Sequence, residues 1–160
     1  MSVKKTKKDQ QPASSQEEPA LMNNAHYIKD LSFENPGVLK NISGEDGPNI
    51  KINIHVDVNP LAEEVYEAAI LLNIKADSKG EALFLVELAY GGIFRLKEGL
   101  PEAEKKHLLL VEAPRLLFPF ARTIVANTTR EGGLPPLLLN PVDFEKLSQQ
   151  AVNKEAKAKH

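Results

Sequence analysis

Strict alternation of apolar and polar residues predicts that the first half of the chain forms a β-sheet. The clearest segment is 50–58, where Ile and Val occupy every second position and polar residues occupy the others. Similar alternation marks the segments 26–34, 64–76 and 81–96. We expect Asn59-Pro60 to break the second strand. Four consecutive strands joined by turns predict an antiparallel sheet.

The first predicted strand has one acidic face. Alternation places Tyr27, Leu31 and Phe33 on one side together with Lys29. The other side carries Ile28, Asp30, Ser32 and Glu34. We therefore expect Asp30 and Glu34 to point in the same direction.

Two glycine-rich places predict irregular structure in the sheet. Residues 35–49 contain three Gly and two Pro among 15 positions, which predicts a long crossover loop between the first two strands. Loops of this length are often functional. The pair Gly91-Gly92 inside the fourth strand indicates a bulge or a sharp bend.

The spacing of apolar residues becomes typical of a helix after Gly99-Leu100-Pro101. The positions that follow helical spacing are Leu117, Phe120, Ala121, Ile124, Val125 and Thr128, and Gly132-Gly133 supplies a stop. Pro114 and Pro119 each lack an amide hydrogen, so we expect one long, kinked helix or two pieces. A shorter C-terminal helix is expected to open at Asn140, with Pro141 at its first position. Four strands followed by helices predict an α+β fold.

The composition divides the chain into a body and two tails. Residues 1–25 are rich in Lys, Gln, Ser, Glu and Pro, which predicts a disordered N-terminal tail, and residues 148–160 are expected to be a flexible C-terminal tail. The body, residues 26–147, holds 13 basic and 18 acidic residues, a net charge of −5. A negative body argues against nucleic-acid binding. The chain has no apolar run long enough to span a bilayer and no apolar stretch typical of a secretory signal, so we expect a cytoplasmic protein.

No catalytic constellation emerges from the sequence, and we predict that the protein is not an enzyme. The chain has no Cys, and its four His residues show no metal-ligand spacing, so neither a metal nor a cofactor is expected. No glycine-rich phosphate-binding motif occurs. One long helix can cover only one face of a four-stranded sheet. We therefore expect apolar surface to be left both for self-association and for a ligand.

Four segments carry a resemblance to a known family: YIKDLSFE (27–34), FLVELAYGGIFRL (84–96), PRLLFPFAR (114–122) and GGLPPLLLNPVDFEKL (132–147). They closely resemble SecB, the bacterial protein-export chaperone, in the same order and with nearly the same spacing. The resemblance covers essentially the whole body. It implies a four-stranded antiparallel sheet with a crossover loop, one long helix and a shorter C-terminal helix, assembled into a homotetramer as a dimer of dimers. It also implies an ATP-independent chaperone that holds unfolded precursor polypeptides translocation-competent and delivers them to the SecA ATPase.

The resemblance implies two sites. The acidic surface that meets SecA in the family matches Asp30, Glu34, Leu85 and Glu87. The apolar groove that holds clients matches Leu39 and Ile42 of the crossover loop, and Leu134, Leu137, Phe144 and Leu147 beyond the long helix. The C-terminal tail departs from the family pattern because it is rich in lysine.

Two alternatives stay open at this point. A SecB-like chaperone that protects an antitoxin would have a similar sequence, and a neighbouring toxin–antitoxin pair would favour it. A hotdog-type acyl-thioesterase shares a long helix packed on an antiparallel sheet. Its catalytic group would have to be Glu102 or His107, the only candidates near the start of the long helix.

Overall fold

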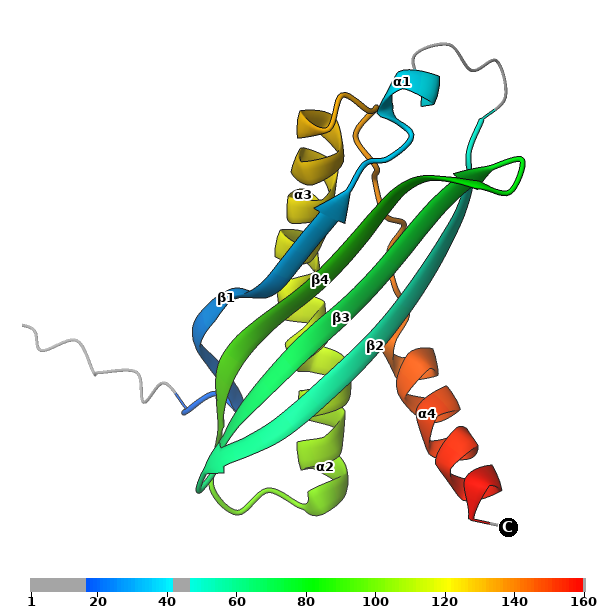
Figure 1. Ribbon diagram of the computed structural model, residues 1–160. Helices are drawn as coiled ribbons and strands as arrows, with labels where there is room; N and C mark the ends of the chain where they lie inside the picture. Colours follow the sequence, from blue (N-terminus) through cyan, green and yellow to red (C-terminus); the bar gives the residue numbers. More distant parts are fainter. Residues whose placement is uncertain (1–16, 42–46, 160) are drawn as a thin grey trace, which may run out of the picture.

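The computed structural model describes residues 17–41 and 47–159. Its centre is a four-stranded antiparallel sheet in the order β1-β4-β3-β2 (Figure 1). The strands are β1 (Leu21–Glu34), β2 (Asn49–Ala62), β3 (Val65–Ser78) and β4 (Glu81–Leu96). The crossover between β1 and β2, which contains the short helix α1 (Val38–Asn41), carries the chain from one edge of the sheet to the other. The predicted α+β fold and crossover are confirmed.

The strand boundaries differ from the predictions at β1 and β2. Strand β1 begins at Leu21, so residues 21–25 belong to the sheet and not to a disordered tail. Strand β2 continues through Asn59-Pro60 to Ala62. An edge strand tolerates proline because one side of its backbone has no neighbouring strand to bond. Pro60 lies on such an edge strand, and the register shifts just after it.

Two register shifts occur in β1, and they reverse the predicted faces of Tyr27 and Ile28, while Asp30, Ser32 and Glu34 share a face as predicted. The shifts lie between Asn23 and Ala25 and between Ile28 and Asp30, beside the pair Gly91-Gly92 of β4. Because the bulge adds one residue, Tyr27 pairs with Gly91 on the outer face while Leu31 pairs with buried Leu88 on the helix face. The prediction that Tyr27 shares a face with Leu31 and Phe33 was therefore wrong. The predicted irregularity exists, but it lies in β1, where the two shifts flank His26 and Tyr27, the residues that pair with Gly92 and Gly91.

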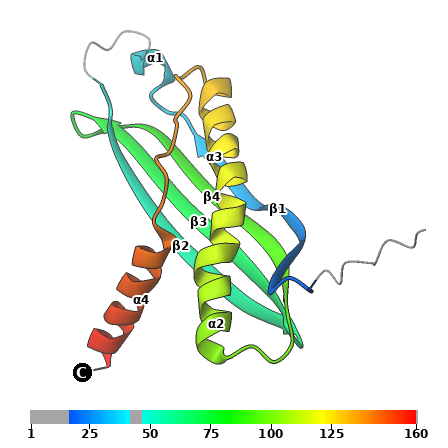
Figure 2. The same ribbon diagram turned by 180° about the vertical axis from the view of Figure 1, so that it is seen from behind.

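One long helix backs the sheet (Figure 2). It runs through α2 (Glu102–His107), the π-helical segment η1 (Leu108–Glu112) and α3 (Ala113–Glu131). The wide turn η1 immediately precedes Pro114, and Pro119 lies inside α3. A proline interrupts the regular bonding of a helix, and a wide turn is one way to accommodate it. The helix packs closely at Gly92, where an added Cβ would lie 2.9 Å from the Cδ2 atom of Leu117.

The core lies between this helix and one face of the sheet. The strands contribute alternate residues, such as Ala68, Ile70, Leu72 and Ile74 of β3, as the pattern predicted. The helix contributes Leu117, Ala121 and Val125, all 0% exposed. Phe120, which the helical period also placed on this face, is 46% exposed.

An extended segment, residues 134–139, leads from α3 to the C-terminal helix α4 (Phe144–Ala158). The predicted cap Asn140 is wrong, because Asp143 caps α4 by accepting a hydrogen bond from the Lys146 amide at 3.0 Å. The helix continues beyond residue 147, so most of the predicted flexible tail is helical and exposed. Within the described ranges, no helix is long and apolar enough to cross a membrane.

Candidate functional site

An apolar pocket of about 650 Å³ opens where the crossover loop, the β3–β4 turn and the segment 134–137 meet. We call it the crossover pocket. Its apolar lining residues are Pro48, Ile50, Leu83, Phe84, Leu134, Pro135, Pro136 and Leu137. Its polar lining residues are Lys40, Ser78, Lys79 and Glu81. The pocket thus offers an apolar floor with a charged rim.

Thr129, buried near the end of α3, holds one wall of the crossover pocket in place. Its hydroxyl donates to the Val125 carbonyl at 3.0 Å and accepts from the Leu137 amide at 2.9 Å. The Leu134 amide donates to the carbonyl of Thr129 itself at 3.2 Å. These bonds satisfy backbone groups that would otherwise be left unpaired in an extended segment. Leu134 and Leu137, the two leucines that this segment contributes to the pocket, are therefore fixed to α3.

The opposite wall depends on Gly37 of the crossover loop. The Gly37 amide donates to the Leu83 carbonyl at 3.0 Å, and a Cβ at this position would lie 2.7 Å from the Leu83 Cα. No side chain fits at that distance, so glycine allows the loop to lie on β4. At the rim, Lys40 pairs with Glu81 and lowers the pKa of its carboxyl group. This pair is exposed and contributes little to stability.

The structure brings together only part of the predicted groove. Leu134 and Leu137 line the crossover pocket, and Leu39 is 80% exposed on α1, outside the pocket lining. Phe144 is 1% exposed and packs edge-on against Phe118, so it is part of the core and not of an open groove. Leu147 is half-buried against the same core. Ile42 lies outside the described residues.

Sequence reasoning missed most of the pocket floor. Ile50 was assigned to a buried strand face, but the long helix packs mainly on the other strands, and the apolar face of β2 stays partly open, with Ile52 41% exposed. Phe84 is a core residue with one edge at the pocket. The number of predicted strands could have indicated this opening, because a single helix does not cover all four strands of a sheet.

The four residues predicted to meet SecA do lie together. Glu34 pairs with Leu85 and Ser32 pairs with Glu87 across β1 and β4, while Asp30 pairs with Ala89. Paired residues of an antiparallel sheet share a face. This face is the one that the helices leave uncovered (Figure 1). We call the set Asp30, Glu34, Leu85 and Glu87 the outer acidic patch.

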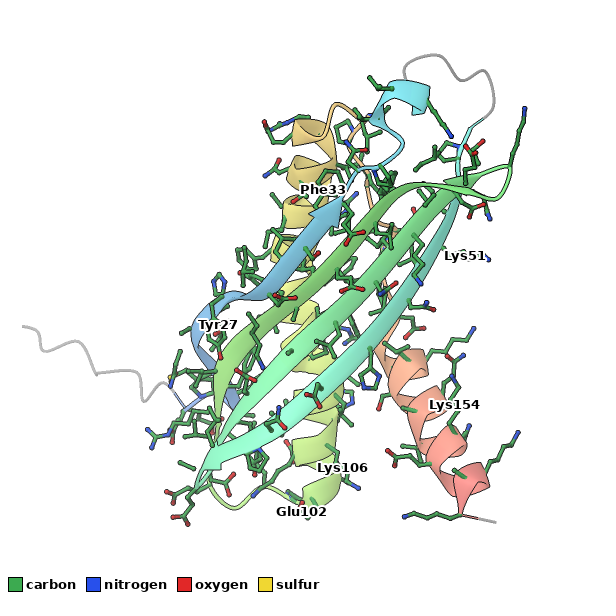
Figure 3. All side chains as sticks on the ribbon, viewed as in Figure 1. Tyr27, Phe33, Lys51, Glu102, Lys106 and Lys154 are labelled. Carbon is green, nitrogen blue, oxygen red and sulfur yellow. The ribbon has the colours of Figure 1, made fainter. Side chains whose placement is uncertain are left out.

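A hydrogen-bonded cluster borders the outer acidic patch. The Glu67 carboxylate accepts from the Tyr27 hydroxyl at 2.5 Å and from Lys29 Nζ at 2.6 Å (Tyr27 is labelled in Figure 3). The bonds from Lys29 and Tyr27 lower the pKa of Glu67. Burial, followed by the hydrogen bond to Glu67, raises the pKa of Tyr27 to about 12. Lys29 neutralises the charge of Glu67, so Glu67 adds no net negative charge beside the outer acidic patch.

A third surface is the outward side of α3. Leu116 and Phe120 are 49% and 46% exposed, and the Phe120 ring lies tilted against His26 with centroids 4.3 Å apart. Ile28 of β1 adds a further half-exposed apolar side chain. Large apolar side chains gathered on one helix face are typical of an association surface.

The alternative catalytic residues are not arranged as an active site. Glu102 and His107 lie on the surface of α2, with side chains 85% and 47% exposed, and neither lines the crossover pocket. Within residues 17–41 and 47–159, no group of three or more His, Cys, Asp or Glu side chains is placed to hold a metal ion.

An open apolar pocket and an uncovered, charged sheet face are typical of the class of proteins that bind other polypeptides. Comparison with known proteins identifies the family within this class. The family model described as preprotein translocase subunit SecB matches residues 14–155. The chain therefore belongs to the SecB family of protein-export chaperones.

Individual relatives agree with this assignment. Protein-export protein SecB of Paramagnetospirillum magneticum is 53% identical over 135 residues, covering 83% of this chain and 86% of that protein. Its counterpart in Mesorhizobium japonicum is 46% identical over 142 residues, covering 88% and 84%. Among solved structures, a SecB-like chaperone of Mycobacterium tuberculosis in complex with an antitoxin peptide has a TM-score of 0.65. It is 13% identical and covers 77% of this chain and 91% of that chain, so it supports the fold alone.

Proposed function

We propose that this protein is an ATP-independent holding chaperone in the cytoplasm, which binds unfolded precursor polypeptides in the crossover pocket and the adjoining apolar surface. The observation that carries the proposal is the open apolar floor, and Leu39 and Leu138, each next in sequence to a lining residue, are exposed as well. Burying about 100 Å² of a client's apolar surface contributes roughly 2.5 kcal/mol. A folded client hides this surface, so the chaperone selects unfolded chains.

The proposal includes a homotetramer built as a dimer of dimers. The apolar outward side of α3, with Leu116 and Phe120, supports it because a second copy would remove this surface from water. Several pockets in one assembly would bind one long client at once, and weak contacts would add through multivalency.

The proposal also includes delivery to SecA through the outer acidic patch. Leu85 pairs with Glu34 of β1 on one side and with Lys75 of β3 on the other, and Glu87 lies two residues along β4, on a face that no described helix covers. The three carboxylates of the patch suit a partner with basic residues. Charge reversal of Asp30 and Glu87 is expected to weaken SecA binding while client capture remains. The crossover pocket lies on a different surface, so the two activities are separable.

The experiment that tests client binding is a refolding assay. An excess of the purified protein is expected to delay refolding of a slow-folding precursor, and Leu137→Asp is expected to shorten the delay because it places a charge in the pocket. Leu61→Asp is the matched control, since Leu61 is 55% exposed and outside the pocket lining. Refolding at the spontaneous rate in the presence of the wild-type protein would refute the proposed function.

A further inference from the structure

The middle of the uncovered sheet face is apolar. Leu71 of β3 pairs directly with Ala89 of β4, and both are half-buried although no described helix covers this face. Ala89 pairs in turn with Asp30 of β1, and Leu71 pairs with His55 of β2. Leu71 and Ala89 therefore lie one row of residues from Glu87 and form an apolar pair beside the outer acidic patch. A solvent-facing strand position normally carries a polar residue, so a leucine here indicates a contact surface.

A neighbouring residue of β3 holds one carboxylate of the patch. Asn73 pairs with Glu87 across β3 and β4, and its Nδ2 donates to Glu87 Oε1 at 3.1 Å. This bond restricts the rotamers of an exposed glutamate that would otherwise sample several. A carboxylate that is already oriented loses less side-chain entropy when a cationic partner binds.

Polar side chains bound the apolar pair Leu71 and Ala89 at both ends. Towards one end of the sheet, Tyr27 packs over Gly91, where an added Cβ would lie 3.3 Å from the ring. This end is closed by the neutralised cluster of Tyr27, Lys29 and Glu67. Towards the other end, the next outward residue of β3 after Asn73 is Lys75, which is exposed.

We propose that the docking surface for SecA continues from β1 and β4 onto β3, where Leu71 is a contact residue and Asn73 positions Glu87. The inference rests on the proposed function. The occupant is a segment of SecA rich in lysine or arginine that also inserts an apolar side chain over Leu71 and Ala89. A partner rich in basic residues suits this face better than a second copy of this chain, because the carboxylates Asp30, Glu34 and Glu87 outnumber the lysines Lys51 and Lys75 on the same face.

The test measures SecA affinity at equilibrium with the full-length protein and purified SecA. Leu71→Thr keeps a strand-forming residue but removes apolar area, and it is expected to weaken binding about fivefold to tenfold. Leu71→Lys adds a charge that repels a cationic segment, and a larger loss is expected. Asn53→Ala is the matched control for Asn73→Ala, because Asn53 lies in the same row on the neighbouring strand β2. All variants are first compared with the wild type by circular dichroism and thermal unfolding.

A double-mutant cycle separates positioning from direct contact. If Asn73 acts through Glu87, Asn73→Ala should weaken binding about threefold in the wild-type background and have no effect in the Glu87→Gln background. Asn73→Ala should also reduce the salt dependence of binding, which a purely structural residue would leave unchanged. An equal effect of Asn73→Ala in both backgrounds would overturn the positioning role.

The outcomes distinguish this inference from the proposed function. Unchanged affinity in both folded Leu71 variants, together with weakened binding on charge reversal of Asp30 and Glu87, would overturn the extension onto β3 and leave SecA docking intact. Unchanged affinity after charge reversal would overturn SecA docking at this face altogether. Weakened binding by Leu71→Thr, Leu71→Lys and charge reversal, with Asn53→Ala unaffected, would support both.

Discussion

Glu67 shows how single residues shape the uncovered sheet face. Its carboxylate, which is 14% exposed, binds both Tyr27 and Lys29 and fixes two side chains of β1 against β3. The bulge in β1 makes this possible, because it leaves both Tyr27 and Lys29 near the outer face. The sequence pattern alone placed Tyr27 with the core residues, since a bulge leaves no periodic signal. A single inserted residue thus decides which side chains border the outer acidic patch.

The first prediction concerns Tyr27. Alkaline titration followed by phenolate absorbance should show Tyr27 ionising near pH 12, and Tyr27→Phe should remove that step. Glu67→Gln should move the step part of the way toward pH 10, because burial of the ring remains. The folded state holds this proton more tightly than the unfolded state. Its contribution to stability is therefore present below pH 10 and is lost as the pH rises through about 12. Ionisation of Tyr27 at the pH of an exposed tyrosine would contradict the hydrogen-bonded geometry.

At the scale of elements, the sequence predicted most of the fold. Strand β4 was predicted with its observed ends, and β3 with its buried face, because alternation is strong in both. The start of α4 was missed, since Asn140-Pro141 and Asp143 both offer helix-start signals and packing of Phe144 decides between them. Leu134 and Leu137 were expected in the client groove, but the contact that fixes their segment was missed. It depends on Thr129, whose hydroxyl accepts from the Leu137 amide eight residues away, a bond that leaves no local pattern.

The second prediction concerns this wall. Thr129→Val preserves shape but removes the acceptor for the Leu137 amide, so it should lower the free energy of unfolding by about 1–3 kcal/mol. It should also reduce client capture, because Leu134 and Leu137 lose their fixed position. Thr123→Val is the matched control, since the Thr123 hydroxyl is exposed and bonds only within its own helix in the described structure. Equal denaturation midpoints and client affinities for the Thr129 and Thr123 variants would argue against this role.

At the scale of the whole molecule, one helix on a four-stranded sheet leaves three surfaces open. They are the crossover pocket, the outer acidic patch and the outward side of α3. The sequence predicted that some apolar surface would remain uncovered, but it did not predict where. Phe144, expected in the groove, is buried in the core, whereas Ile50 on the partly open face of β2 lines the pocket.

The third prediction concerns assembly. Light scattering should give a mass four times the chain mass of 17.6 kDa. Phe120→Lys should shift the mass toward smaller species, because it places a charge on the apolar side of α3. Leu138→Lys should leave the mass unchanged, since Leu138 is 64% exposed on the segment beside the crossover pocket. A wild-type protein of one chain mass would remove the basis for the tetramer.

The most direct measurement of client binding uses the absence of Cys from the chain, which allows a single label to be placed without background. An environment-sensitive fluorophore on Pro136→Cys reports from the pocket lining, and one on Lys157→Cys reports from the exposed end of α4. Addition of an unfolded precursor should change the emission at position 136 far more than at position 157, and the same precursor after folding should change neither. Binding of the unfolded precursor without any change at position 136 would contradict capture in the crossover pocket.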